Sequence, residues 1–136
     1  MNQPRTSVIT DWRVRDENAL PDVSPGETFE RVIAFQKFVV LRRILVNGMS
    51  LSQLQIGTVE VPFELETTDG PVRIYRPRDL ESDDLAGRLI AVGAKVATND
   101  SIAVAPGLEI RSLLRNEGTT PAKPRIALLV LEEVSR

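Results

Sequence analysis

The sequence predicts an all-β protein: a single antiparallel β-sandwich, jelly-roll-like domain of about eight strands with an extended N-terminal arm. Short segments rich in β-branched and aromatic residues follow one another from Phe29 to the C-terminus. Pairs of turn-forming residues separate these segments: Asn47–Gly48, Asp69–Gly70 and Pro106–Gly107. The chain has 136 residues, which is enough for one domain with its own core.

Residues 1–28 differ from the rest of the sequence, because they contain three prolines, mixed charges and only scattered apolar residues. We therefore divide the chain into an extended arm of residues 1–28 and a β-sandwich domain of residues 29–136. Within the arm, Val8–Val14 has partly alternating apolar residues and can pair as a short strand. The lone tryptophan, Trp12, also lies there, and a large aromatic side chain is typical of interfaces. Two interpretations stay open: a disordered tail, or an arm that docks on a neighbour through Trp12.

The segment FERVIAFQKFVVLRRILV (29–46) is rich in β-branched and aromatic residues with partial alternation. It is long and has no internal glycine or proline, so a helix is a rival interpretation. We favour one or two strands, with Gln36–Lys37 as a bend or bulge. Asn47–Gly48 then supplies the positive φ angles of a tight hairpin turn. We expect most of the phenylalanines to lie in the core: Phe29, Phe35, Phe38 and Phe63.

Residues 59–66 alternate apolar and polar side chains, which is typical of a half-buried strand with one solvated face. The apolar set is Val59, Val61, Phe63 and Leu65, and the polar set is Glu60, Pro62, Glu64 and Glu66. Pro62 places this strand at an edge or a bulge, because proline cannot donate to the ladder. A short strand over 71–77 follows the next turn.

Residues 78–87 are read as an acidic loop, or as one helical turn capped by Ser82. We expect the following stretch, 88–98, to be a strand. Its glycine, Gly93, indicates a bulge within that strand.

Three further strands complete the domain, over 101–104, 108–114 and 125–134, with a loop at 116–124 before the last. The closing strand is mostly apolar. A strand that is apolar on both faces belongs at the centre of its sheet with cover on each side. If its own domain covers only one face, a partner subunit must cover the other.

Composition argues against ordinary enzyme chemistry. The chain has no cysteine and no histidine, which removes thiolate catalysis, cysteine–zinc sites and the Ser-His-Asp and Cys-His arrangements. Its 17 basic and 19 acidic residues give a formal net charge of −2, which is too balanced to indicate nucleic-acid or membrane-surface binding. The N-terminus lacks the apolar region of a signal peptide, and the apolar runs are too short to span a bilayer. We therefore expect a soluble chain without cofactor or metal.

Two groups of acidic residues are candidates for a chemical site. The first comprises Asp79, Glu81, Asp83 and Asp84, and the second comprises Glu60, Glu64 and Glu66. The first offers oxygen ligands for calcium, but it lacks the EF-hand spacing, so a solvated loop is the simpler interpretation. Carboxylate pairs can hydrolyse glycosides, but spacing of this kind gives a polar strand face by default. A small enzyme that uses carboxylates alone is therefore the least favoured function.

Three arginines surround the lone tyrosine: Arg73, Arg76 and Arg78, with Tyr75 between them. This arrangement can stack nucleic-acid bases. The same arginines face the acidic loop, however, so internal or intersubunit salt bridges are at least as well supported, and no glycine-rich phosphate loop is present. We do not expect nucleic acid as a partner. Tyr75 is the candidate platform of another class, a β-sandwich module that binds carbohydrate or a receptor.

The stretch VAPGLEIRSLLRNEGTTPAKPRIALLVLEE (104–133) joins a Pro-Gly turn, a strand, a loop with asparagine, glycine, threonine and prolines, and an apolar final strand. In this pattern, and in the polar arm before the first strand, the chain resembles the small β-sandwich (jelly-roll-like) virion structural proteins of bacterial viruses. The resemblance implies subunits that form, decorate or clamp a shell, usually as trimers or larger rings with arms crossing between neighbours. It implies no catalytic residues.

We therefore expect a non-enzymatic structural protein of a viral particle, a capsid or capsid-decorating subunit made in the host cytoplasm and located in the virion. Its partners are copies of itself, as a trimer or larger assembly, and other virion proteins. The candidate contact residues are Trp12, Arg13 and Arg15 in the arm and Arg76, Arg78, Asp83 and Asp84 as rim charges. The alternative, a ligand-binding module, predicts an exposed Tyr75 beside a cleft and a monomer in solution.

Overall fold

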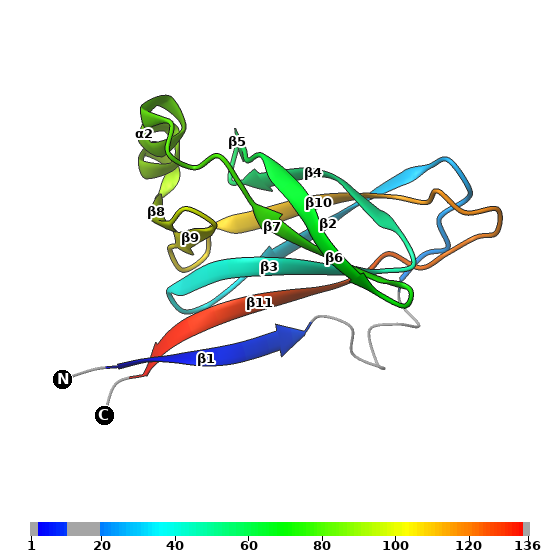
Figure 1. The fold of residues 1–136 in the computed structure, drawn as a ribbon, viewed down its shortest axis with the longest axis horizontal. Helices are drawn as coiled ribbons and strands as arrows, with labels where there is room; N and C mark the ends of the chain where they lie inside the picture. Colours follow the sequence, from blue (N-terminus) through cyan, green and yellow to red (C-terminus); the bar gives the residue numbers. More distant parts are fainter. Residues whose placement is uncertain (1–2, 11–19, 135–136) are drawn as a thin grey trace.

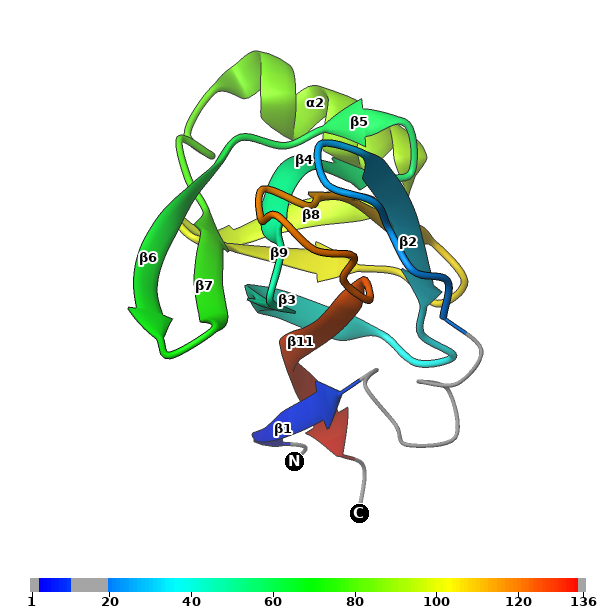
Figure 2. The same ribbon diagram turned by 90° about the vertical axis from the view of Figure 1, so that its right-hand side faces the viewer.

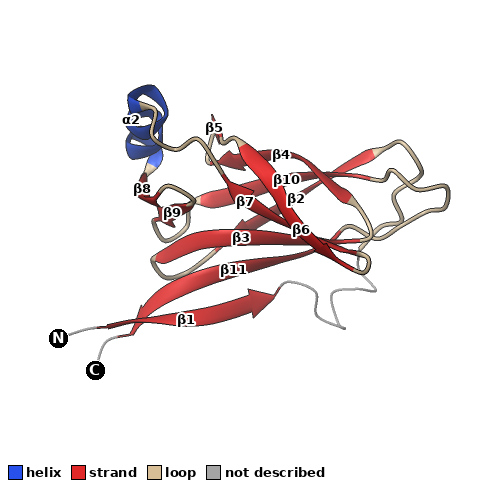
Figure 3. Ribbon diagram, in the orientation of Figure 1, coloured by secondary structure: helices blue, strands red, loops and turns tan. Residues whose placement is uncertain are grey.

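Two antiparallel sheets face each other in the computed structural model, which describes residues 3–10 and 20–134 (Figure 1). The seven-stranded sheet contains β1 (Gln3–Thr10), β3 (Val39–Asn47), β6 (Phe63–Asp69), β7 (Val72–Pro77), β8 (Ala94–Thr98), β9 (Ser101–Val104) and β11 (Arg125–Val134). The four-stranded sheet contains β2 (Thr28–Ala34), β4 (Ser50–Ile56), β5 (Val59–Glu60) and β10 (Glu109–Arg115). Within the described residues one helix, α2 (Asp83–Val92), accompanies these strands (Figure 3). The predicted all-β sandwich is confirmed.

A single apolar layer fills the space between the sheets. Strands β3 and β11 supply inward side chains from the large sheet, and strands β4 and β10 supply them from the small sheet. The largest fully buried members include Leu41, Ile44, Leu54, Ile56, Ile110, Leu114 and Leu128. Alternation of buried and exposed residues along these strands thus produces a two-layer core.

The closing strand β11 lies between β1 and β3 in the large sheet, whose main order is β1-β11-β3-β7-β6. The closing strand is therefore paired on both sides, as predicted, but it lies next to the edge strand β1 and not at the centre of the sheet. Strand β3 is more central, because β7 and β9 also pair with it. Strand β1, from the part of the chain assigned to the arm, adds an outer strand with eight paired residues.

The segment 29–46 forms two strands, β2 and β3, with a bend at Gln36–Lys37 as predicted. The helical alternative does not occur. The hairpin expected at Asn47–Gly48 is wrong, because the turn leads from β3 in the large sheet to β4 in the small sheet. Gly48 has a φ of 81°, and its N–H donates to the carbonyl of Pro71 at 3.0 Å, so the turn is tied to its own sheet rather than closed as a hairpin.

The strand expected over 59–66 is split at Val61–Pro62 into β5 and β6, which belong to different sheets. Pro62 therefore marks the crossing between the layers. The expected edge position is confirmed for β6, which ends the large sheet. Because an edge strand lacks a neighbour on one side, Leu65 is 48% exposed and does not join the core as its alternation suggested.

Helix α2 replaces the loop and the first half of the strand that were expected over 78–98. Ser82 is the N-cap, as the one-turn alternative proposed, and its side chain accepts a hydrogen bond from the Leu85 N–H at 3.4 Å. Leu85 and Leu89 are buried one turn apart on the face toward the sandwich. Gly93 ends the helix with a φ of 103° and is a C-cap, not a bulge.

The helix packs on β8 and β5 at one end of the sandwich, away from β1 and β11 (Figure 2). It closes that end of the core through Leu85 and Leu89. In the described part of the chain, therefore, no helix lies over the strands β1, β11 and β3.

Asn116 ties residues 20–28 to the loop between β10 and β11. Its buried side-chain amide donates to the carbonyls of Val23 at 2.8 Å and Thr120 at 2.9 Å, and its side-chain oxygen accepts from the Gly118 N–H at 2.9 Å. Two antiparallel backbone bonds join Val23 to Ala122. This part of the expected arm is therefore fixed to the sandwich.

We expect Asn116→Ala to lower the free energy of unfolding by about 2 kcal/mol, because it removes three hydrogen bonds of a buried side chain that join residues 20–28 to the loop before β11. Urea unfolding measures the change. The neighbouring exposed Glu117→Ala is the matched control and should change stability by less than about 0.5 kcal/mol. Equal effects of the two substitutions would contradict the structural role of Asn116.

Candidate functional site

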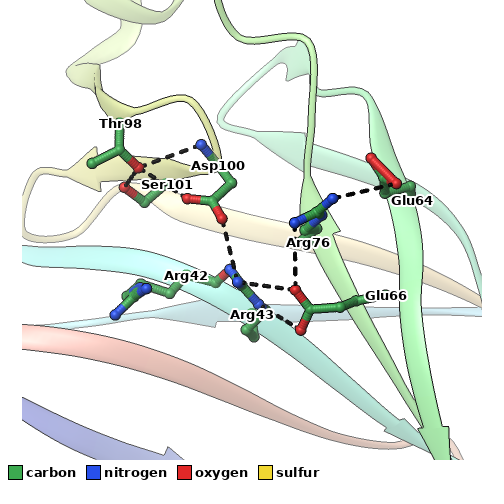
Figure 4. A network of polar contacts seen from close by, with 8 residues as sticks. All are labelled: Arg42, Arg43, Glu64, Glu66, Arg76, Thr98, Asp100 and Ser101. Atoms are coloured by element: carbon green, nitrogen blue, oxygen red, sulfur yellow. Dashed lines mark hydrogen bonds and ion pairs between the residues drawn. The ribbon is translucent and has the colours of Figure 1, made fainter.

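A network of charged side chains lies on the outer face of the large sheet (Figure 4). Arg43 of β3 is its centre. The guanidinium donates from Nε to Glu66 at 3.0 Å and from a terminal nitrogen to Asp100 at 3.3 Å. The Arg43 side chain is only 15% exposed, so its two carboxylate partners neutralise a largely covered charge.

Two β-bulges bring these residues together. Between the pairs Leu129–Arg43 and Val130–Leu41, the extra residue on β3 is Arg42. On β6, Glu66 is the extra residue opposite β7. A bulge redirects side chains locally. As a result Arg43 points into the network and Arg42 points away from it (Figure 4).

The turn between β8 and β9 holds Asp100 in place. The Thr98 hydroxyl donates to Asp100 Oδ1 at 3.0 Å and accepts from the Asp100 N–H at 3.3 Å. Ser101 lies 2.6 Å from the same hydroxyl and donates to it, because the Thr98 proton is already used. Burial alone would raise the pKa of Asp100, but the Thr98 hydrogen bond, the charge and hydrogen bond of Arg43 and the charge of Arg42 together lower it.

The predicted rim charges make ion pairs within the chain. Arg76 lies 3.7 Å from Glu64 and 3.6 Å from Glu66, and Arg78 lies 3.4 Å from Asp79. Asp84 pairs with Arg88 one helical turn away at 3.1 Å. Asp83 lies beside it in the first turn of α2, where a negative charge favours the helix dipole. The role of Arg76, Arg78, Asp83 and Asp84 as subunit contacts stays a prediction. Trp12, Arg13 and Arg15 lie outside the described residues.

Tyr75 is not the exposed platform that the alternative, a ligand-binding module, requires. It is 6% exposed and packs edge-to-face on Phe63, with ring centroids 5.7 Å apart. Its hydroxyl accepts a hydrogen bond from the Leu51 N–H at 3.1 Å. Since Leu51 belongs to β4, this bond joins the two sheets. Tyr75 lies on the side of β7 that faces the core. The alternation of residues in the sequence did not show which side of this strand would face inward.

The acidic residues singled out in the sequence are divided between the two sheets, the loop before α2 and the first turn of α2. Glu60 lies in the small sheet, whereas Glu64 and Glu66 lie in the large sheet beside Arg76, so the shared face expected for them is wrong. A polar groove of about 190 Å³ runs past Arg76, Arg78 and Asp79 and mixes both signs of charge. No group of three or more acidic side chains suited to a metal ion occurs in the described residues.

An apolar groove of about 390 Å³ adjoins the network and was missed by sequence reasoning. Its apolar lining comes from Phe38, Val40, Ala97 and Leu131, and its polar lining from Arg42, Thr98, Ser101 and Glu132. The expectation that Phe38 belongs to the core is wrong, because its side chain is 51% exposed, whereas Phe29, Phe35 and Phe63 pack against the core. The available signal was the position of Phe38, directly after the bend at Gln36–Lys37 and one residue before the inward Val39.

No known protein family, curated protein or solved structure matches the chain. Among the described residues, no helix has the length and apolar character needed to cross a bilayer.

We expect Asp100→Asn to lower the stability at pH 7 by about 1 kcal/mol, because it removes a charge-assisted hydrogen bond from the network. The folded pKa of Asp100 lies below its ordinary value, so the stabilising charge is fully present above the unfolded pKa of about 3.9 and is lost as pH falls through the folded pKa. Urea unfolding of both proteins between pH 7 and pH 2 should show the difference vanish at the acidic end. A difference that persists unchanged at pH 2 would contradict the assignment.

Proposed function

We propose that the chain is a non-enzymatic structural subunit of a viral particle, a capsid or capsid-decorating and stabilising protein. It assembles with copies of itself through exchange of its N-terminal arm and through symmetric contacts. Its other partners are further virion proteins, and its location is the virion.

The observation that carries this proposal is the apolar outer face of the large sheet. Val40 pairs with Leu131, and Leu45 pairs with Ile74. Each of these four partly buried residues is next in the chain to a core residue, so its side chain lies on the opposite side of the sheet from the core. A two-layer sandwich needs only one apolar face on each sheet. A second apolar face on the central strands is typical of a surface that another subunit covers.

The position of β1 supports exchange of the arm. It is an outer strand, and all eight of its residues pair with β11. An edge strand can leave its own sheet and make the same backbone hydrogen bonds with β11 of a neighbour, as in domain swapping. Because the bonds made are the same in either arrangement, exchange links subunits at low cost in free energy.

The assignment to a virion rests on the pattern of the closing strands and the polar arm. The absence of cysteine and histidine from the sequence, and the ion pairs that Arg43 and Arg76 make with Glu66 and Asp100, favour a structural role over an enzymatic one. In a symmetric particle each contact between subunits is repeated many times, so individually weak contacts can hold a large particle together.

A ligand-binding module remains the second candidate because of the groove at Phe38. Its volume of about 390 Å³ and apolar lining suit a small apolar molecule. The burial of Tyr75 removes the aromatic platform that carbohydrate binding needed. This candidate requires a monomer in solution that binds a ligand at the groove.

We expect light scattering to show that the full-length chain is a trimer or larger. A chain lacking residues 1–19 should form assemblies of fewer subunits at the same concentration. This deletion removes β1 but keeps the bonds of Val23 and Asn116 that fix residues 20–28. Trp12→Ala in the full chain should also weaken the assembly, and Trp12→Phe, which keeps an aromatic ring, should weaken it less. A monodisperse monomer for both lengths of chain would contradict the proposal.

A further inference from the structure

We propose that the groove at Phe38 is a self-complementary contact between two copies of this chain related by a two-fold axis, in which Phe38 of each copy enters the groove of the other and Arg42 of each faces Glu132 of the other. This inference rests on the proposed self-association and specifies one surface that performs it.

The shape of the groove supports a reciprocal contact. Phe38 lines the groove and is 51% exposed, and Val40, Ala97 and Leu131 complete an apolar lining whose volume of about 390 Å³ is large enough for an aromatic ring. A surface of this kind carries both an exposed aromatic side chain and an apolar groove that can receive one. In a two-fold contact the same patch is used on both copies, so each Phe38 is buried once and each groove is filled once.

The charges of the groove favour a second copy over a partner of one sign. Arg42 and Glu132 line the same groove. Neither side chain makes an ion pair or hydrogen bond with another described residue, although the charge of Arg42 acts on Asp100. By contrast, Arg43 and Arg76 on the same face are paired. A two-fold axis supplies Arg42 and Glu132 each with an opposite charge, twice per dimer, whereas a partner of single sign would face one like charge.

The other exposed apolar side chains do not offer such a surface. Val32, Leu65 and Ile90 are each large and exposed, but none lines the groove. Val32 lies beside the paired charges of Glu30 and Arg111, and Leu65 lies between Glu64 and Glu66 on an edge strand. Single exposed apolar residues of this kind are common on protein surfaces.

The first test is Phe38→Glu in the full-length chain, studied by sedimentation or mass photometry over a dilution series. We expect the concentration at which the assembly half-dissociates to rise about 30-fold or more, because the substitution removes an aromatic anchor and places a charge in the groove. The matched control is Val32→Glu, which introduces the same charge at a comparably exposed apolar residue on the small sheet and should leave the dilution curve unchanged.

The second test exchanges the charges. Arg42→Glu and Glu132→Arg should each weaken the assembly about 10-fold, because each places like charges opposite one another, and the double variant should restore it. This test stands even if Phe38→Glu fails to fold, because rescue by the double variant requires the two residues to face each other. Mutually independent effects of the two charge reversals would overturn the pairing.

The outcomes separate this contact from the broader proposal. A wild-type chain that assembles and is insensitive to Phe38→Glu and to both charge reversals overturns the two-fold contact and leaves self-association intact. A wild-type chain that is monomeric at every concentration overturns both. If that monomer binds the dye 8-anilinonaphthalene-1-sulfonate and Phe38→Glu abolishes the binding, the groove takes a small apolar ligand instead of a second copy.

Discussion

The antiparallel pairing of β3 with β11 holds the large sheet together, and the rest of the structure depends on it. These strands are far apart in the sequence and carry apolar residues toward both sides. Their inward residues, such as Leu41, Ile44 and Leu128, form the floor of the core, against which β4 and β10 pack. Strand β3 also receives β7 and β9, and β11 receives β1, so every other strand of this sheet attaches directly or indirectly to the same pair.

The same pairing also creates the surface on which the proposed function depends. One extra residue on β3, at the bulge opposite Leu129 and Val130, leaves two consecutive arginines on the outer face. Arg43 makes ion pairs with Glu66 and Asp100. These ion pairs attach the edge strand β6 and the β8–β9 turn to the centre of the sheet. Arg42 is left beside Phe38 and Leu131 in the apolar groove. The outer face of the sheet thus carries an ion-pair network at one side and an apolar groove at the other.

Much of this architecture follows from local sequence patterns. Alternation and turn residues were sufficient to predict an all-β sandwich, the bend at Gln36–Lys37 and the pairing of the closing strand on both sides, because these features depend on side-chain period and on overall apolarity. Local sequence patterns did not predict where the chain crosses from one sheet to the other. Asn47–Gly48 and Pro62 mark turns in either case, but whether a turn closes a hairpin or crosses to the other sheet depends on contacts far along the chain.

Two further differences between the predicted and the observed structure also depend on contacts far along the chain. The helix over 83–92 contains isoleucine and valine, which favour a strand, and a glycine, which disfavours a helix, but the cap at Ser82 and the burial of Leu85 and Leu89 against the sandwich outweigh these preferences. The groove at Phe38 depends on residues from four elements or their flanking turns, and on a bulge that no local pattern reveals. Sequence reasoning therefore identified the closing strand as paired on both sides and could not identify the surface that it exposes.

The most direct test of the account is the covalent mass of an oxidised variant, Val8→Cys with Leu129→Cys, under denaturing conditions. These residues are partners in the β1–β11 ladder, and the chain has no other cysteine to compete. If arms are exchanged between subunits, the disulfide joins different chains and the product is a covalent trimer or larger species. A product that consists only of single chains with an internal disulfide would show that β1 stays with its own sheet and would contradict assembly by arm exchange.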